Sequence, residues 1–256
     1  MTGELVTERH GAVLIMRLNR PDARNALNAA LIDAIGRTVT GAENDPQIRA
    51  IVLTAAGDRI FCSGMDLREF ASGGGAIGSP EGMAGFNRLL QGELTVPVVG
   101  AANGTAVGGG LELLLGCDVI VAAETAKFGL PEVKRGLYPA GGGTAIGTRI
   151  PLAVALEMTM TGNPVEARRA YELGLVNAVT PPEQVLDAAL GLAESIAENA
   201  PLGLAAVKEL VRLGVTDPAR AARRNKELQR SVFSSEDAKE GAAAFMERRK
   251  PVWKGR

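Results

Sequence analysis

Short apolar segments alternate with amphipathic ones over the first half of the chain. Each apolar segment is rich in Val, Ile, Leu or Ala and is closed by turn residues, which is typical of buried strands. These segments lie at 12–18, 49–54, 96–101 and 118–123. After the first segment, Asn28 can cap a helix that continues to about Ala42, with an apolar face made of Leu31, Ile32, Ile35 and Val39. Strands that alternate with helices predict an α/β architecture.

The pattern becomes helical after about Thr180. Proline and capping residues at Pro201, Asp217-Pro218 and Ser234–Glu236 are typical starting points of further helices, which end near Arg249. The C-terminal part of the chain is therefore predicted to be all-helical.

Residues 71–85 differ in composition from the segments on either side. They are rich in Gly, Ser and Ala and include three successive glycines at 73–75. Such a stretch is either a mobile surface loop or a functional element. The functional interpretation is a lid over a substrate pocket.

Composition and charge narrow the possible functions. The chain has 256 residues, of which 46% are hydrophobic and 22% charged, with a net charge of −1, so no global charge attracts it to nucleic acid or to an anionic membrane. The two cysteines, Cys62 and Cys117, form neither a disulfide framework nor a metal-site spacing. The sequence shows no signal-peptide pattern and no apolar run of about 18–20 residues, so we expect a cytoplasmic protein.

His10 is the only histidine, and it lies in the first charged segment. Catalysis by a Ser-His-Asp or Cys-His arrangement, or by a histidine-bound metal, would depend on this one terminal residue. Carboxylates, backbone amides or a cofactor must therefore carry any chemistry.

The glycine-rich stretch 103–118 contains the strongest candidate site. Gly108, Gly109 and Gly110 lead into a short apolar helix whose single carboxylate is Glu112. Glycines allow backbone amides to approach a ligand closely at the positive end of a helix. The stretch is neither a Walker loop nor a dinucleotide-binding fingerprint, because no Lys-Ser/Thr follows and the glycine spacing differs. Glu112 lies either on one wet face of this helix or in the interior, where an unpaired carboxylate is costly.

Two other segments give weaker signals. Glu132 follows Pro131 in the stretch 126–144, which also contains Gly141–Gly143, and by residue statistics alone it is a solvated loop residue. Ser63 lacks the G-x-S-x-G context of a nucleophile and has no histidine partner. The neighbouring Cys62 is expected to be a small buried apolar residue.

Taken together, these motifs resemble the enoyl-CoA hydratase/isomerase (crotonase) superfamily and occur in the family's order. They lie at 20–28, 61–67, 104–118, 128–144, 170–177 and 235–250, so the resemblance covers nearly the whole chain. The resemblance implies an α/β fold in which repeated ββα units form a spiral core, residues 1–195, that holds an acyl-CoA site. It also implies a C-terminal helical region, residues 196–256, that mediates assembly into a homotrimer or a dimer of trimers.

The resemblance also assigns roles to individual residues. Glu112 and Glu132 match the two catalytic glutamates of the hydratases, and the amides of Met65 and Gly109 match the oxyanion hole. The Met65 side chain is larger than the alanine common in the family and would narrow the pocket. No metal and no cofactor are implied, because coenzyme A is part of the substrate. The substrate-binding positions implied are Ala26, Ser63, Asp66, Leu67, Gly108 and Pro131.

These roles predict an enoyl-CoA hydratase, which adds water reversibly to a 2-enoyl thioester. Two amides aimed at the thioester oxygen stabilise the enolate, and losing one such donor costs about 3–4 kcal/mol. The two carboxyl groups hold and deprotonate the water and supply the proton to C2. An isomerase, or a specialised acyl-CoA hydratase/dehydratase such as one acting on a carnitine-type thioester, is the alternative. Isomerases of the family commonly keep one acid, at the Glu132 position, so the pair favours hydration.

A non-catalytic acyl-CoA-binding or RNA-binding protein is the third interpretation. Its only support is the basic segment 221–256, which has ten Lys/Arg against five Asp/Glu. A solvated helix face explains such a run more simply, and help in binding the coenzyme A phosphates is the functional alternative. We therefore expect an acyl-CoA thioester and other copies of the chain as partners, but no nucleic acid and no membrane.

Overall fold

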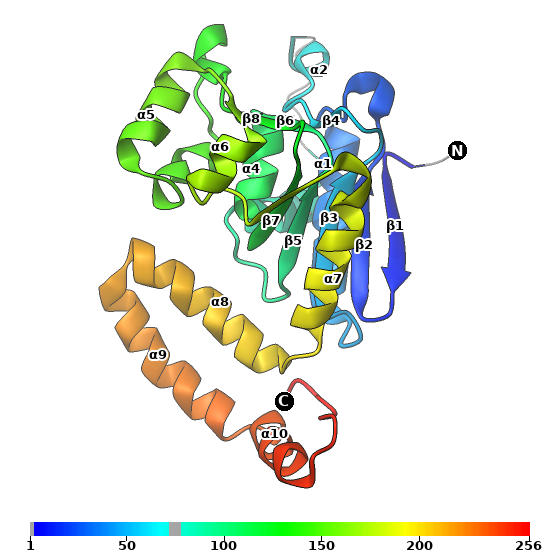
Figure 1. Cartoon of the computed structure of the whole chain (residues 1–256), viewed down its shortest axis with the longest axis vertical. Helices are drawn as coiled ribbons and strands as arrows, with labels where there is room; N and C mark the ends of the chain where they lie inside the picture. The colour runs from blue at the N-terminus through cyan, green and yellow to red at the C-terminus, as the bar shows by residue number, and fades with distance from the viewer. Residues whose placement is uncertain (1–2, 72–77) are drawn as a thin grey trace.

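The computed structural model describes residues 3–71 and 78–256, in which two sheets are surrounded by helices (Figure 1). The strand order of the larger sheet is β1-β2-β3-β5-β7-β10. β1 is antiparallel to β2, and all other neighbours in this sheet are parallel. The strands are β1 (Leu5–His10), β2 (Val13–Leu18), β3 (Ala50–Ala55), β5 (Val98–Ala102), β7 (Val119–Ala123) and β10 (Ala178–Thr180).

The smaller sheet has the order β4-β6-β8-β9, with only β9 antiparallel to its neighbour. Successive strands alternate between the sheets: β3, β5 and β7 lie in the larger one, and β4, β6 and β8 in the smaller one. A helix follows each pair, so the chain repeats a ββα unit, and the predicted spiral fold is confirmed. The small-sheet strands are β4 (Ile60–Cys62), β6 (Thr105–Val107), β8 (Lys127–Gly129) and β9 (Val165–Glu166).

The helices complete the core. Helix α7 packs on the larger sheet against β3, β5 and β7. The helices of the core are α1 (Ala29–Asn44), α2 (Leu67–Ala71), α3 (Pro80–Leu90), α4 (Gly109–Gly116), α5 (Leu152–Thr161), α6 (Ala167–Glu172) and α7 (Val185–Ala197). Short 3₁₀ turns lie at η1 (Pro21–Ala23), η2 (Glu132–Arg135), η3 (Gly143–Thr148) and η4 (Pro182–Gln184).

The apolar pattern predicted these elements because the parallel strands are buried on both faces. The four predicted strands correspond to β2, β3, β5 and β7 within one or two residues. Asn28 caps α1 by accepting a hydrogen bond from the Leu31 amide at 2.9 Å. The predicted apolar face of α1 is buried at Leu31, Ile32, Ile35 and Val39.

The prediction of a loop over 71–85 is wrong for its second half. There, helix α3 begins at Pro80, directly after its N-cap Ser79. The glycines of this helix serve close packing against α1. A Cβ on Gly85 would lie 2.7 Å from Thr40 Oγ1, and a Cβ on Gly36 would collide with the carbonyl of Gly82. Without glycine the two helix backbones could not approach this closely. The lid hypothesis concerns residues 72–77, which lie outside the described residues.

Three helices after the core form an arm that extends away from the sheets (Figure 1). They are α8 (Pro201–Thr216), α9 (Pro218–Phe233) and α10 (Glu236–Glu247). Their predicted starts are confirmed: Asp217 accepts from the Arg220 amide and Ser235 from the Ala238 amide. Helix α9 buries none of its residues, and α8 buries only Ala206. None of the helices in the described part of the chain has the length and apolar character needed to cross a bilayer.

The connection between β2 and α1 depends on Asn25. Its backbone is left-handed, with φ 53°, and its side chain is only 1% exposed. The side-chain amide donates to the carbonyls of Ala56 and Ile60 at 2.9 and 3.0 Å, and its oxygen accepts from the Arg20 amide at 2.9 Å. Asn tolerates the left-handed region better than most residues. This side chain therefore ties the connection to the carbonyls of Ala56 and Ile60.

Asn25→Ala is expected to lower the free energy of unfolding by about 3 kcal/mol, because buried carbonyls lose their donor and Ala disfavours the left-handed backbone. The matched control Asn28→Ala removes a helix cap and one part-buried hydrogen bond to Glu4, and it should cost about 1 kcal/mol. Urea unfolding of both variants measures the difference. Equal losses would contradict the role given to Asn25.

Candidate active site

The backbone comes unusually close to itself where β4 ends and α4 begins. Gly64 and Gly108 have positive φ values of 90° and 56°. A Cβ on Gly64 would lie 3.1 Å from the amide nitrogen of Gly109, and a Cβ on Gly110 would collide with the carbonyl oxygen of Cys62. Only glycine permits this approach, so the glycine triplet brings the start of α4 against the residues that follow β4.

Two backbone amides meet at this contact. Gly64 accepts from the Leu27 amide at 2.8 Å, and the Asp66 amide donates to Leu27 at 2.9 Å. In such a parallel bridge, the intervening Met65 directs its own N–H to the opposite side. Gly109 is the first residue of α4, so its N–H has no carbonyl acceptor within the helix. A Cβ on Gly109 would lie 3.7 Å from the Met65 nitrogen. The arrangement suits a small anionic oxygen held between both amides.

Glu112 lies one helical turn after Gly109 and is 7% exposed. The apolar run of α4 is buried on every side, so the interpretation that places Glu112 on a wet face is wrong. Its Oε1 accepts from the Gly143 amide at 2.9 Å, and the Gly141 amide also hydrogen-bonds the carboxylate. Burial raises the pKa of Glu112, while these two amides oppose the rise.

Gly141 and Gly143 contact the Glu112 carboxylate, a relation that the sequence did not reveal. A Cβ on Gly141 would lie 2.7 Å from Glu112 Oε2, and one on Gly143 would lie 3.0 Å from Glu112 Oε1. The sequence signal was the second glycine triplet, which indicates close packing but not what packs there. The structure shows that the triplet forms a backbone cradle for the carboxylate of Glu112.

Glu132, the first residue of η2, lies on the other side of the same contact. A Cβ on Gly108 would lie 3.2 Å from Glu132 Oε1. The second oxygen, Oε2, is buried without a hydrogen-bond partner among the described residues. Burial raises the pKa of Glu132, and the nearby charge of Glu112 raises it further, against the opposing effect of its own backbone N–H and of Arg135. An unpartnered buried carboxylate oxygen is rare in folded proteins, so packing alone does not account for its position.

The remaining predicted positions lie beside this centre. Met65 and Leu67 are each 44% exposed, and Leu67 begins α2 directly after Asp66. Gly108 is the N-cap of α4, and Pro131 the N-cap of η2 that holds Glu132. These residues therefore share one region of the surface with the two amides and the two carboxylates.

Arg20 ties the 20–28 connection to the loop after β4. It donates to the Ala26 carbonyl and to Asp66 Oδ2, the latter at 3.1 Å, while the Ser63 amide donates to the Arg24 carbonyl. Burial opposes the ionisation of Asp66, but the Arg20 hydrogen bond and the backbone amides of Arg68 and Glu69 hold its pKa below the ordinary value. The sequence contains the family motif that begins at Arg20, but the order of residues does not reveal that Arg20 pairs with Asp66.

Other candidates lie elsewhere or are inert. His10, at the end of β1, has its Nε2 3.2 Å from Oε1 of Glu194 on α7. Burial raises the pKa of both Cys62 and Cys117 to about 12, so neither supplies a thiolate near neutral pH, and the prediction of Cys62 as a buried apolar residue is confirmed. In the described ranges no cluster of three or more His, Cys, Asp or Glu residues could hold a metal ion.

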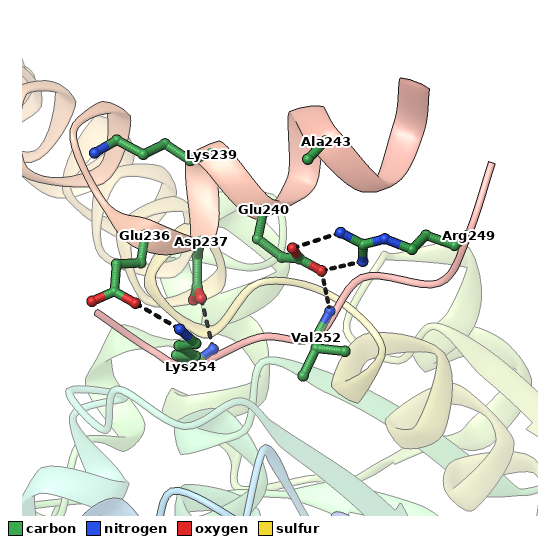
Figure 2. A pocket seen from close by; sticks show the side chains of 8 residues that line it. All are labelled: Glu236, Asp237, Lys239, Glu240, Ala243, Arg249, Val252 and Lys254. Carbon is green, nitrogen blue, oxygen red and sulfur yellow. Dashed lines mark hydrogen bonds and ion pairs between the residues drawn. The ribbon is translucent and has the colours of Figure 1, made fainter. Parts of the chain in front are cut away.

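A cavity of about 530 Å³ lies between α10 and the irregular C-terminal residues 249–254, far along the sequence from the two glutamates. Figure 2 shows that its acids are already paired: Glu240 accepts from Arg249 and from the Val252 amide, and Lys254 bonds Glu236. The paired charges fasten the C-terminal tail to α10. We do not assign catalysis to this cavity.

Comparison with known proteins gives consistent matches along the whole chain. Residues 8–256 match the family model described as Enoyl-CoA hydratase/isomerase. The chain is 39% identical over 264 residues to carnitinyl-CoA dehydratases of Salmonella agona and Citrobacter koseri, with full coverage of both sequences. Among solved structures, an enoyl-CoA hydratase from Mycobacterium tuberculosis H37Rv matches with 41% identity and a TM-score of 0.92. A carnitinyl-CoA hydratase from Mycobacterium avium matches with 42% identity and a TM-score of 0.79. Each of these two matches covers 100% of this chain and 100% of the solved chain.

Glu132→Gln is expected to stabilise the fold at pH 7. The folded state raises the pKa of Glu132, so ionisation opposes folding, and the wild-type protein loses stability as pH rises from the unfolded-state pKa to the folded-state pKa. The variant has no such ionisation, so it should be more stable than the wild-type protein at pH 7. This difference in the free energy of unfolding should disappear when the pH falls below the unfolded-state pKa. Urea unfolding at a series of pH values measures it. The exposed Glu124→Gln is the control, and a destabilised Glu132→Gln protein at pH 7 would refute the electrostatic assignment.

Proposed function

The chain belongs to the enoyl-CoA hydratase/isomerase (crotonase) family, and we propose that it adds water reversibly to the double bond of a 2-enoyl-CoA thioester. One observation carries the proposal: two buried or half-buried carboxyl groups in unequal settings flank a pair of convergent backbone amides. Because an isomerase needs only one acid to move a proton, the second carboxyl group favours hydration over isomerisation.

The amides of Met65 and Gly109 would receive the thioester oxygen. As water adds at C3, negative charge develops on that oxygen, and two fixed N–H donors lower the energy of the resulting enolate. The positive end of α4 acts in the same direction. The exposed side chains of Met65 and Leu67 border the route by which the acyl-CoA would arrive.

The unequal settings of the glutamates suggest a division of labour. Glu112 accepts two amide hydrogen bonds, which favour its ionised form, so it would take a proton from the water. Glu132 has an unpartnered oxygen and faces the charge of Glu112, so it would keep its proton and deliver it to C2. Hydroxide thus bonds to C3 and a proton to C2. The proton gained by Glu112 must return to Glu132 before the next turnover.

Dehydration of a carnitine-type thioester is the second candidate, supported by the names of the curated relatives that match along their full length. The same amides and carboxyl groups would serve it, because removal of water from a 3-hydroxyacyl thioester is the reverse reaction. A turnover screen with crotonyl-CoA, longer 2-enoyl-CoA esters and carnitinyl-CoA separates the two substrate classes.

Glu112→Gln and Glu132→Gln are each expected to lower kcat by about 10²- to 10⁴-fold, because a positioned acid or base contributes that much. Affinity for the acyl-CoA, measured by calorimetry, should change little, since neither group needs to bind coenzyme A. Glu8→Gln on the exposed face of β1 is the control and should keep full activity. Retained turnover in both site variants would remove the catalytic assignment.

We further propose that the chain assembles with copies of itself, as a homotrimer or a dimer of trimers, through residues 196–256 and a second apolar surface on α5. Helix α8 presents Val207, Val211 and Val215 at 62–64% exposure, one helical turn apart on a single face. Helix α5 presents a similar stripe of Leu152, Leu156 and Met160, at 48–72% exposure. Contiguous apolar stripes of this kind are typical of protein–protein contacts.

Val211→Asp is expected to shift the assembly toward smaller species, because a charge in a buried interface is costly. Sedimentation analysis should find the wild-type protein at three or six times the chain mass of 26.6 kDa. Val6→Asp, on the edge strand β1, is the control and should sediment as the wild type does. A monomeric wild-type protein would refute this assembly.

A further inference from the structure

The carboxyl end of α4 is held by cationic side chains. Arg149 Nη2 donates to the carbonyls of Leu115 and Cys117 at 2.7 and 2.6 Å. Arg212 Nη2 donates to Gly116 and Cys117 at 3.2 and 3.1 Å. The last carbonyls of a helix have no N–H donor within the helix, and they form the negative end of its dipole. Both guanidinium groups therefore satisfy the helix that begins at the oxyanion-hole amide of Gly109.

Asp118 balances part of this positive charge. Its carboxylate accepts from Arg212 at 2.9 Å, from Lys208 at 2.8 Å and from the Val98 amide at 2.8 Å. The Lys208 side chain is only 8% exposed. Arg212 and Lys208 both come from α8, so this part of the cluster fastens the C-terminal arm to the core.

Arg149 has a different origin from the other two cations. It is the residue that ends η3, and the first residue of η3 is Gly143, whose amide holds the carboxylate of Glu112. The segment 143–149 is therefore bonded to α4 at two points: at Glu112 through Gly143 and at the carbonyls of Leu115 and Cys117 through Arg149. Two attachments fix the segment against sliding along the helix, which one attachment alone would not.

We propose that Arg149 is a positioning residue that keeps η3 in register with α4, so that the Gly143 amide stays on the Glu112 carboxylate. Its catalytic consequence rests on the function proposed above. The planar guanidinium suits this task because one nitrogen supplies two N–H groups to carbonyls at the same helix end. Arg212 donates to the same Cys117 carbonyl but belongs to α8 and not to η3. A variant of Arg212 therefore removes capping of α4 without removing the attachment of η3.

The groups around both ends of the segment are few. Glu112 faces the titratable Glu132 of η2 and the amides of the 141–143 turn. Arg149 faces Cys117, Asp118 and Arg212, and burial followed by the charge of Arg212 lowers its pKa. If η3 slides, Glu112 loses donors that favour its ionised form, and its pKa rises further.

Arg149→Met tests the proposal against the matched variant Arg212→Met. Two readouts are measured on the full chain: amide hydrogen exchange of the peptide spanning residues 141–149, and the pH profile of kcat/KM with crotonyl-CoA. Arg149→Met should exchange faster in that peptide, lower kcat about 10- to 100-fold with KM nearly unchanged, and move the acidic limb of the profile to higher pH. Arg212→Met should leave the acidic limb where it is in the wild-type protein.

An unchanged exchange rate in Arg149→Met, or an equal shift of the acidic limb in both variants, would overturn the proposal. The exchange measurement does not depend on turnover, so it tests the positioning role even if the wild-type protein hydrates no enoyl-CoA, an outcome that would refute the proposed function alone. If Arg149→Met fails to fold, Arg149→Lys keeps the charge but loses the two-carbonyl geometry, and it should show the same changes with smaller amplitude.

Discussion

The site depends on one steric constraint, which is the close approach of the backbone after β4 to the first turn of α4. Glycine at 64, 108 and 110 removes the Cβ atoms that would separate the two segments. The approach sets the amide of Met65 beside that of Gly109, and it leaves room for a carboxyl oxygen of Glu132 next to Gly108. Side chains contribute little to the geometry at this point. The backbone itself forms the surface on which an oxyanion could be held.

Burial of Glu112 is the main energetic cost of this arrangement. A carboxylate in an apolar helix is tolerated only when it is hydrogen-bonded, and the 141–143 turn supplies the donors. Glu132 lacks comparable donors on Oε2, so the two glutamates differ in their preference for a proton. Unequal environments for paired carboxyl groups are a recurring basis of acid–base chemistry. The contact of η3 with α4 therefore bears on both stability and reactivity.

The C-terminal helices connect this centre to the outer parts of the molecule. Lys208 and Arg212 of α8 reach Asp118, two residues after the end of α4, while an adjacent face of α8 presents exposed valines. A helix that is anchored to the core by charge and also carries an exposed apolar stripe suits a role between the core and another copy of the chain. Helix α9 packs against α8 and is tied to it by the Arg224–Glu209 ion pair, but none of its side chains is fully buried in the single chain.

The sequence by itself determined the alternation of strands and helices, the capped start of α1 at Asn28 and the family motifs, because each of these depends on local pattern. It also singled out Glu112, Glu132, Met65 and Gly109 by resemblance. Only the tertiary structure decided that Glu112 is buried, that Gly141 and Gly143 hold it, and that α3 replaces the second half of the expected loop. These outcomes depend on contacts between residues far apart in the chain, such as Gly85 against α1 or Arg149 against Cys117. Periodicity records which face of a segment is apolar, but it does not record which segment will lie against that face.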